Sequence, residues 1–584
     1  MYSGQQKPLL LNYTLISVFL ILFLSIFKLQ IIESTKYTTI AEKNFVRIKT
    51  LFPIRGEIYD RKYRAIVLNK PSYNLYISLN KIQDRKQVTE FISQNFDLSL
   101  DEINKIIYDN RFRLYKDVLI VQNISFGKMV KISEQMNYYP SLSLKSEKIR
   151  HYLYNNHFTG YTGRINENEY TKYKEQGYSI NSYIGKSGLE KYYEDLLRGK
   201  NGYQLLQVDA SGQNLQFFKH NLDKPPVNGT SMILTIDNDL QYYISSIFPK
   251  EKNGAIVVMD VKTGGILAYV SKPDFNQNIF SENLTTEQWN DIINDPAKPM
   301  LDRIIHGTYP PASVFKLIMA TLALEDEVIN EKTKLTRCEG GMWFGNRYFK
   351  CWWEKGHGRL NVLDAIKYSC DVFFYDLSTQ FSLEQINNFT KENMLTIRTG
   401  VDLPGERNGF FPTRKWYKDN YGKYVGIIGH KVNLAIGQGE VLVTPLQICA
   451  YYAALGNNGK WIKPHLLTKT ITGTESNYIQ PEIRQLPVSQ KNMALIQKSL
   501  FNAVNESYGT GVAASLSNVS VFGKTGSAEN HMGKKTHSWF AGYARQDEFE
   551  IAFVVFLENA GHGGSISAPI ARKIIQYYYN LEKS

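Results

Sequence analysis

The chain has 584 residues, which exceeds the usual size of one compact domain and predicts two or three domains. Hydrophobic residues make up 43% of the chain, which is enough to build packed cores. The net charge is +13, but lysine and arginine are spread along the whole chain and form no nucleic-acid-binding motif, so we expect no nucleic acid partner.

A mostly apolar run covers residues 9–32 and is broken by Asn12, Lys28 and Gln30. About 20 helical residues cross a bilayer core, so we predict a transmembrane anchor at 9–32 after a cytoplasmic tail at 1–8. A cleaved signal peptide is the alternative, but no small-x-small cleavage site follows the run. Basic residues flank both ends, so loop charge leaves the orientation open.

Residues 33–229 are predicted to form a domain that contains no catalytic constellation. The alternating run at 73–79 indicates a strand, and Ser99 and Glu102 have the spacing of a capping box at the start of a helix. A stretch rich in turn residues at 223–229 marks the end of this domain.

Residues 230–584 are predicted to form a second domain. Its strands are expected at 232–236, 255–259, 266–270, 519–522, 539–544 and 551–557, and a terminal helix at 568–579. With a helical middle, this order predicts an α+β fold in which an antiparallel sheet is sandwiched by helices. The tripeptide Lys262-Thr263-Gly264 lies between two of these strands and is expected to be a hairpin turn without chemistry.

Ser313 and Lys316 place a hydroxyl nucleophile and an amine on one face at the start of an apolar run over 314–324. The run is apolar on nearly every side, so it predicts a buried helix, and Pro310 and Pro311 suit the entry to it. Free N–H groups in that turn favour developing negative charge. Lys316 is therefore a candidate base for a Ser313 nucleophile.

Serine and lysine three residues apart are weak evidence alone, because Ser25/Lys28, Ser78/Lys81 and Ser125/Lys128 repeat the spacing. Two further elements follow in order, Ser369-Cys370-Asp371 and then Lys524-Thr525-Gly526-Ser527. The order Ser-x-x-Lys, Ser-x-Asn/Asp, Lys-Thr-Gly resembles the penicillin-interacting serine acyltransferases.

Other segments resemble the class B, elongation-type penicillin-binding proteins. They are Arg55-Gly56-Glu57-Ile58-Tyr59-Asp60-Arg61, the segment from Gly185 to Gly202, Ala435-Ile436-Gly437-Gln438-Gly439 with Thr444-Pro445-Leu446-Gln447, and His537-Ser538-Trp539-Phe540. The resemblance implies a transpeptidase fold with an extended N-terminal pedestal and one transmembrane helix. The chain departs from it at Ala312, where the family commonly has glycine, and has Asp371 where the wider superfamily has asparagine.

The resemblance also implies roles for the motif residues in acyl transfer on the D-alanyl-D-alanine end of a peptidoglycan stem peptide. Ser313 would attack, Lys316 would be the base beside the cation Lys524, and Ser369 would relay protons, with Asp371 supporting the site. The backbone N–H groups of Ser313 and Ser527 would form the oxyanion hole, and Thr525 and Ser527, on either side of Gly526, would hold the terminal carboxylate.

Simpler structural roles compete with each of these assignments. Ser369 could cap a helix, Lys524 could be a solvated charge on an edge strand, and Asp371 could be a helix-start carboxylate. Competing functions are a septal transpeptidase, a β-lactamase and a non-catalytic scaffold that binds β-lactams. The anchor and pedestal argue against a β-lactamase, and no broken motif favours a scaffold.

Four cysteines occur in the chain, and Cys449 lies in an apolar run that predicts a core position. Cys338, Cys351 and Cys370 remain, with His357 among them. Three thiolates and one imidazole complete a closed tetrahedral set for one structural zinc ion, although the spacing is unlike that of zinc fingers. The alternative is one disulfide and one free thiol. The resemblance favours zinc, since some elongation-type members have four such ligands that end at the middle residue of Ser-x-Asp.

The resemblance further implies partners and a location. Stem peptides and lipid-linked glycan strands would be substrates, β-lactams would be inhibitors, and a rod-shape SEDS-type glycan polymerase with other elongation-complex membrane proteins would be partners. The protein would be a single-pass protein of the bacterial inner membrane with its catalytic domain in the periplasm.

Overall fold

The computed structural model describes residues 6–37, 46–112, 117–180, 182–208, 214–216, 223–281, 284–422, 427–473, 475–530 and 533–583. The chain forms two compact units, and each is described by itself. The first comprises Met1–Ile54, Pro71–Lys148 and Gly199–Gly229, and the second comprises Arg55–Lys70, Ile149–Arg198 and Thr230–Ser584. The domain limits expected from the sequence stay predictions.

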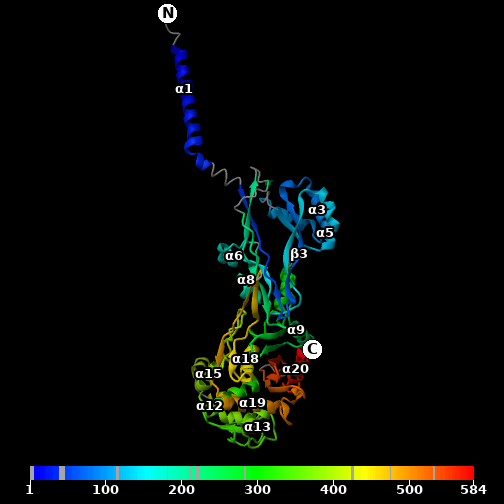
Figure 1. Cartoon of the computed structure of the whole chain (residues 1–584), viewed down its shortest axis with the longest axis vertical. Helices are drawn as coiled ribbons and strands as arrows, with labels where there is room; N and C mark the ends of the chain where they lie inside the picture. Colours follow the sequence, from blue (N-terminus) through cyan, green and yellow to red (C-terminus); the bar gives the residue numbers. More distant parts are fainter. Residues whose placement is uncertain are drawn as a thin grey trace. The chain divides into compact units, whose positions relative to one another are not determined.

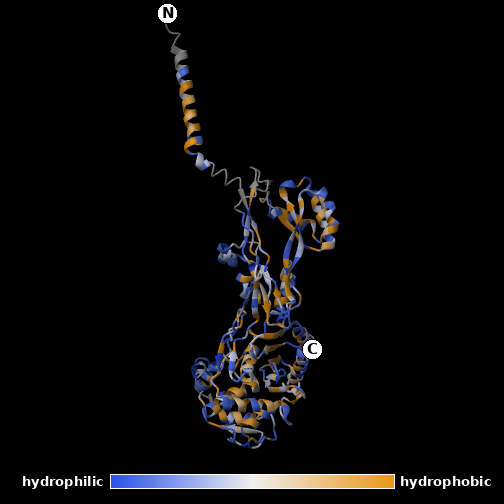
Figure 2. Ribbon diagram, in the orientation of Figure 1, coloured by the Kyte–Doolittle hydropathy of each residue, from blue (hydrophilic) through white to orange (hydrophobic). Residues whose placement is uncertain are grey.

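The first unit begins with helix α1 (Gln6–Phe27), which continues as one turn of π-helix, η1 (Lys28–Ile32). The stretch Leu11–Ile32 has a mean hydropathy of 2.5 and none of it is buried. Hydrophobic residues predominate along α1 (Figure 2). The length and composition therefore suit a membrane span, as predicted, and a signal sequence would meet the same criteria.

The rest of the first unit contains short helices and strands around one small core. Their bounds are β1 (Val46–Leu51), η2 (Leu79–Lys81), α3 (Arg85–Asn95), α4 (Leu100–Asp109), β4 (Asp117–Ile124), α5 (Phe126–Ser133), η3 (Gln135–Tyr138), β8 (Gly202–Val208) and β9 (Asn214–Gln216). The later residues of β3 (Ala65–Ser78) pair with β4, and apolar residues of this pair pack against α3 and α4. The predicted capping box of Ser99 and Glu102 is confirmed at the start of α4.

A five-stranded antiparallel sheet forms the centre of the second unit, in the order β12-β11-β21-β20-β19. Its strands are β11 (Gly254–Asp260), β12 (Ile266–Lys272), β19 (Ser520–Ala528), β20 (His537–Gln546) and β21 (Phe549–Leu557). These segments match five of the predicted strands. Lys262-Thr263-Gly264 forms the turn between β11 and β12, as predicted, where the Thr263 N–H donates to the Asp260 carboxylate.

Helices cover both faces of this sheet, because alternate residues of each strand belong to different cores. Ile256, Val258 and Val555 pack with α9 (Asn238–Ile247) and α20 (Ser567–Lys583). Their neighbours along the strands instead join a larger core that includes α12 (Lys316–Glu325) and α18 (Pro445–Gly456) (Figure 1). A sheet buried on both faces needs nearly continuous apolar strands, and this confirms the sandwich predicted from the sequence.

The remaining elements of the second unit surround these cores. The helices are α6 (Glu167–Tyr173), η4 (Lys174–Gln176), α7 (Gly188–Tyr192), α8 (Glu194–Arg198), α10 (Asn278–Ser281), α11 (Thr286–Asn294), η5 (Ala312–Phe315), α13 (Val362–Lys367), α14 (Asp371–Ser378), α15 (Leu383–Glu392), α16 (Arg414–Tyr421), α17 (Ile427–Ala435), α19 (Gln490–Asn505) and η6 (Val512–Ala514). The strands are β2 (Ile58–Tyr59), β6 (Thr162–Arg164), β7 (Tyr183–Gly185), β10 (Ser231–Leu234), β13 (Gly341–Phe344), β14 (Arg347–Lys350), β15 (Lys460–Ile462), β16 (Leu467–Thr472), β17 (Glu475–Tyr478) and β18 (Ile483–Gln485). Strand β5 (Leu142–Tyr152) begins in the first unit and ends in the second.

Arg55 joins two of the segments that carried the family resemblance. Its guanidinium group donates to the buried Glu190 carboxylate at 2.6 Å and to Glu194 at 2.7 Å. Arg150 donates to the other oxygen of Glu190, also at 2.6 Å. Two arginines therefore neutralise a buried carboxylate, and all four residues belong to the second unit.

Candidate active site

Ser313 lies in η5, a single 3-10 turn that runs directly into α12. The other three residues of η5 are buried, whereas Ser313 is half-buried and reachable from solvent. Ala312 adopts the left-handed conformation with φ of 51°, and its N–H donates to the Gly437 carbonyl at 2.8 Å. This conformation interrupts a helical path. Pro311 is the N-cap of η5, so the two prolines lie at the entry to the helix, as expected from the sequence.

The predicted burial of the following helix is confirmed, since nine of the ten residues of α12 are buried. They include Lys316, whose side chain has no exposed surface. The Lys316 ammonium group donates to the Ser369 carbonyl at 2.9 Å, to Ser369 Oγ at 3.2 Å and to Asp371 Oδ1 at 2.7 Å. These three bonds match the three hydrogens of the group. Among the described residues no hydrogen bond joins Lys316 to Ser313, so the amine is held by the second motif.

The second motif lies between α13 and α14. Ser369 has a left-handed backbone with φ of 56°, and the N-cap of α14 is Cys370, so Ser369 does not cap that helix. Asp371 is the first residue of α14 and accepts a second hydrogen bond from the Trp352 N–H at 3.0 Å. Burial raises the pKa of the Asp371 carboxyl, and the charge of Lys316 opposes that rise.

The third motif, Lys524 to Ser527, lies on β19, the edge strand of the sheet. A side chain at Gly526 would meet the Pro311 carbonyl at 3.1 Å and Ala312 Cβ at 3.4 Å, so this strand packs closely against the nucleophile turn. Lys524 is fully buried, which excludes a solvated surface charge. Burial and the charge of Lys316 lower the pKa of Lys524 well below its usual range.

The fold therefore brings together three motifs that lie more than 50 residues apart in the chain. A model of the penicillin binding protein transpeptidase domain matches residues 254–576, and one of the penicillin-binding protein dimerisation domain matches residues 50–234. The chain belongs to the penicillin-binding protein family. This penicillin-binding protein carries all three motifs intact, as a serine acyl-transfer enzyme requires.

Curated relatives and solved structures agree with this family. The Haemophilus influenzae protein named peptidoglycan D,D-transpeptidase MrdA is 32% identical over 96% of this chain and 89% of its own length. The penicillin-binding protein (PBP2) solved in complex with MreC from Helicobacter pylori is 25% identical, with a TM-score of 0.80 over 93% of this chain and all of that one. A chain from a peptidoglycan synthase complex that coordinates polymerization and crosslinking is also 25% identical, with a TM-score of 0.73 over 99% of both chains.

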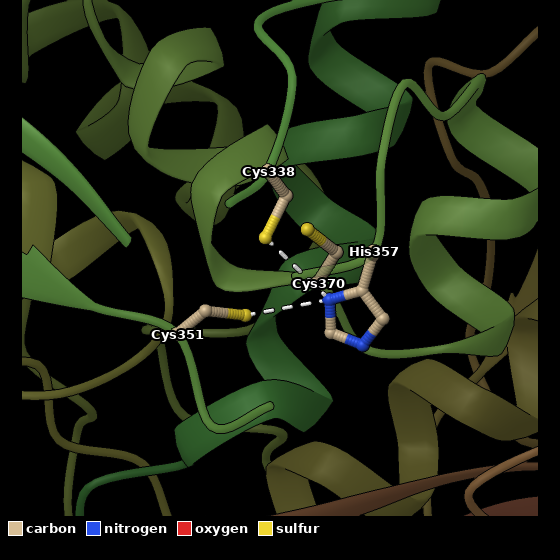
Figure 3. A group of neighbouring side chains, drawn as sticks. All are labelled: Cys338, Cys351, His357 and Cys370. Carbon is tan, nitrogen blue, oxygen red and sulfur yellow. Dashed lines mark hydrogen bonds between the residues drawn. The ribbon is translucent and has the colours of Figure 1, made fainter. Parts of the chain in front are cut away.

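The three cysteines and the histidine of the expected metal site meet in space. The three sulfur atoms and His357 Nδ1 all lie within 4.8 Å of one another and point toward a common centre (Figure 3). Nδ1 lies 3.6 Å from the Cys338 sulfur and 3.5 Å from the Cys351 sulfur. Tetrahedral zinc with bonds of about 2.3 Å to sulfur and about 2.0 Å to nitrogen needs a separation of about 3.5 Å. All four cysteines of the chain carry free thiols.

Electrostatics within this cluster favour thiolates at Cys338 and Cys351 and disfavour a third at Cys370. Hydrogen bonds from the Cys370 thiol and from His357 lower the pKa of Cys338 to about 6 and also lower that of Cys351. Burial lowers the pKa of His357, but its contacts with the Cys338 and Cys351 sulfurs raise the pKa by more than this. The net shift is therefore upward. The two thiolates in turn raise the pKa of Cys370. A divalent cation neutralises closely spaced thiolates of this kind and removes the repulsion between them.

Trp352 is a contact of the site that the sequence did not reveal. Besides its backbone bond to Asp371, its indole N–H donates to the Tyr368 carbonyl at 3.0 Å. It thus contacts residues on both sides of Ser369. The only signal in the sequence was its place next to Cys351.

Proposed function

We propose that this protein cross-links peptidoglycan stem peptides as an elongation-type D,D-transpeptidase and that β-lactams inhibit it. The single observation that supports this most is that the three motifs meet at Lys316. Its amine bonds Ser369 at 3.2 Å, its charge acts on Lys524, and the half-buried Ser313 lies three residues before it. The relatives named peptidoglycan D,D-transpeptidase match 95–96% of the chain.

In the first half-reaction, Ser313 Oγ attacks the carbonyl carbon of the penultimate D-alanine and the bond to the terminal D-alanine breaks. Lys316 must first lose one of the three hydrogens that it donates, and as a neutral amine it then accepts the Ser313 proton. That proton reaches the leaving amine through Ser369, whose Oγ lies 3.2 Å from the Lys316 amine. An amine from a second stem peptide then attacks the ester, and Ser313 regains its proton. Water in place of that amine would give the carboxypeptidase reaction.

The developing oxyanion would be bound by the backbone N–H groups of Ser313 and Ser527, a device whose donors are each worth about 3–4 kcal/mol. The Ser527 hydroxyl accepts a hydrogen bond from the Gly563 N–H at 3.2 Å, which leaves its own hydrogen to donate. With the Thr525 hydroxyl it would hold the substrate carboxylate, and the buried Lys524 would add positive potential.

We also propose one structural zinc ion, held by Cys338, Cys351, His357 and Cys370. The separations within the cluster fit a closed tetrahedral site, and such a site has no open position for catalysis. The metal would fix the backbone of Cys370. Because Ser369 and Asp371 flank it, the same constraint would hold the proton relay in place.

The proposed location is the bacterial inner membrane, with α1 as the single span and the second unit in the periplasm, where peptidoglycan is found. The proposed partners are an MreC-type protein and a SEDS-type glycan polymerase. The MreC-type partner is supported by the Helicobacter pylori penicillin-binding protein solved in complex with MreC. A polymerase partner is supported by the similar chain of a peptidoglycan synthase complex that coordinates polymerization and crosslinking, and its SEDS type rests on the family resemblance.

A fluorescent penicillin tests the enzymatic assignment on the full-length protein in detergent. We expect one covalent adduct per chain, on the peptide that contains Ser313, and none on the Ser313→Ala variant. An adduct that persists in this variant would refute the nucleophile. Rapid release of hydrolysed drug would instead place the protein with the β-lactamases.

A further inference from the structure

The loop after α17 lies between the nucleophile turn and the edge strand of the sheet. Gly437 has φ of 72°, and a side chain there would meet the Ala312 carbonyl at 2.3 Å, so only glycine fits. This close approach lets the Gly437 carbonyl accept the Ala312 N–H at 2.8 Å. Ala312 directly precedes Ser313, so the loop fixes the backbone that presents the nucleophile.

The next residue, Gln438, bonds the edge strand through both ends of its side-chain amide. Its Nε2 donates to the Ser527 carbonyl at 3.0 Å, and its Oε1 accepts the Glu529 N–H at 3.1 Å. A carbonyl at one position and an N–H two positions later are the two groups that a single residue of a neighbouring parallel strand would bond. The Gln438 amide therefore takes the place of one residue of a sixth strand.

The direction of these bonds matters for Ser527. Within a strand, the N–H and C=O of one residue point to the same edge, and alternate residues point to opposite edges. Because the Ser527 carbonyl faces Gln438 and not β20, its N–H also faces away from β20. The Thr525 carbonyl, two residues earlier, bonds the Lys524 amine and not a strand, as this alternation requires.

We propose that Gln438 is a positioning residue that orients the Ser527 N–H toward the oxyanion hole. With its neighbour Gly437 it spans both halves of the hole, because one residue anchors the Ser313 side and the other anchors the Ser527 side. Gln438 touches no reacting atom. It acts by stopping the end of an otherwise unpaired edge strand from twisting away from Ser313. The inference rests on the proposed oxyanion roles of Ser313 and Ser527.

The test is single-turnover acylation of the full-length protein by a chromogenic β-lactam, with the acylation rate constant measured separately from the dissociation constant of the initial complex. Gln438→Met keeps the size of the side chain and removes both hydrogen bonds. We expect the acylation rate constant to fall roughly 10- to 100-fold, less than the ~10²–10³ for complete loss of an oxyanion donor. The dissociation constant should stay within about twofold, because the bonds matter most when the oxyanion forms.

Gln438→Asn provides a second variant, because its shorter side chain cannot reach both Ser527 and Glu529, and it should show the same selective loss. Gln497→Met is the matched control, since Gln497 Nε2 donates to the Leu455 carbonyl at 2.7 Å and to Asn458 Oδ1 at 3.0 Å, and neither partner belongs to the three motifs. It should leave both constants unchanged.

A Gln438→Met protein that acylates within twofold of the wild type would overturn the proposal. So would a loss that affects binding as much as acylation, or one that Gln497→Met reproduces. Failure of the underlying function has a different signature. In that case Ser313→Ala would still be acylated, whatever Gln438→Met does.

Discussion

The Lys316 ammonium group and the Asp371 carboxylate form a buried ion pair, with 2.7 Å between Nζ and Oδ1. The pair connects the helix that follows the nucleophile with the segment that carries Ser369. Asp371 therefore balances the charge of Lys316. Without Asp371, the fully buried Lys316 ammonium group would keep only the neutral carbonyl and hydroxyl of Ser369 as hydrogen-bond partners.

Asp371→Ala should destabilise the protein strongly, since removing one partner of a buried ion pair commonly costs about 3–5 kcal/mol. Thermal unfolding of the full-length protein measures the effect. The control is Asp419→Ala, which breaks an exposed pair with Lys415 and should cost less than about 0.5 kcal/mol. Equal effects of the two substitutions would contradict a structural role for the Lys316–Asp371 pair.

Ala312→Val should lower both stability and the acylation rate, whereas Ala312→Gly should retain both. A β-branched residue is strained at φ of 51°, and the site is closely packed, with Ala312 only 1% exposed. We expect a loss of about 1–3 kcal/mol for valine from overpacking alone. Denaturant unfolding and penicillin labelling measure the two effects. A stable, fully active valine variant would show that Ala312 does not adopt this conformation.

Lys524→Met should stabilise the protein, and most strongly at low pH. At pH values below the lowered pKa of Lys524, this lysine is protonated in both the folded and the unfolded chain. Folding must then bury its full positive charge, which lowers the stability of the folded state. Between that pKa and the ordinary value of 10.5 the unfolded chain binds more protons, so the stability of the wild type rises with pH. The gain from the substitution should therefore shrink as the pH approaches 10.5.

Melting temperatures of wild type and variant between about pH 6 and pH 10 test this expectation. Lys573→Met, at an exposed position on α20, corrects for the general loss of a lysine. A gain in stability that grows with pH would contradict the assignment of a buried charge to Lys524.

Elemental analysis should find about one zinc ion per chain. Cys370→Ser and His357→Ala should each remove the metal, lower the melting temperature and abolish penicillin acylation, because the metal would hold the backbone between Ser369 and Asp371. Cys449→Ala, in the core of α18, should keep the metal. A metal-free protein that acylates normally and contains a disulfide between Cys338 and Cys351 would overturn the zinc proposal.

Residues after Glu33 should lie outside the cytoplasm. Protease added to spheroplasts should cleave the chain without permeabilisation, because the proposed substrate is found only on that side. The predicted cleavage segment is 36–47, of which residues 38–45 lie outside the described residues. Protection of this segment until the membrane is permeabilised would contradict the topology and, with it, the substrate.

The sequence was sufficient to predict the elements whose signal is local. Strands buried on both faces are continuous apolar runs, and α12 is apolar on every side, so both were recognisable from periodicity. The motif residues were recognisable because their order is itself a pattern.

Features that depend on contacts across the chain could not be predicted. The 3-10 turn at Ser313 depends on Ala312 bonding Gly437, more than 100 residues away. The partners of Lys316 depend on how α13 and α14 pack against α12, and the sequence suggested Ser313 as its first contact. Gln438 lies in the segment Ala435-Ile436-Gly437-Gln438-Gly439 that carried part of the family resemblance. Its role follows only from its hydrogen bond to Ser527 on an edge strand of the sheet, which the sequence does not reveal.

The complete burial of α12 also determines how the catalytic machinery responds to heat. Backbone amides in a helix with nine of ten residues buried have no route to solvent except disruption of the surrounding core, so they should exchange hydrogen for deuterium only through global unfolding. Local fraying cannot then displace the serine. The loss of penicillin labelling on heating therefore reports the melting of the whole unit, and a decline of labelling below that temperature points to damage elsewhere in the site.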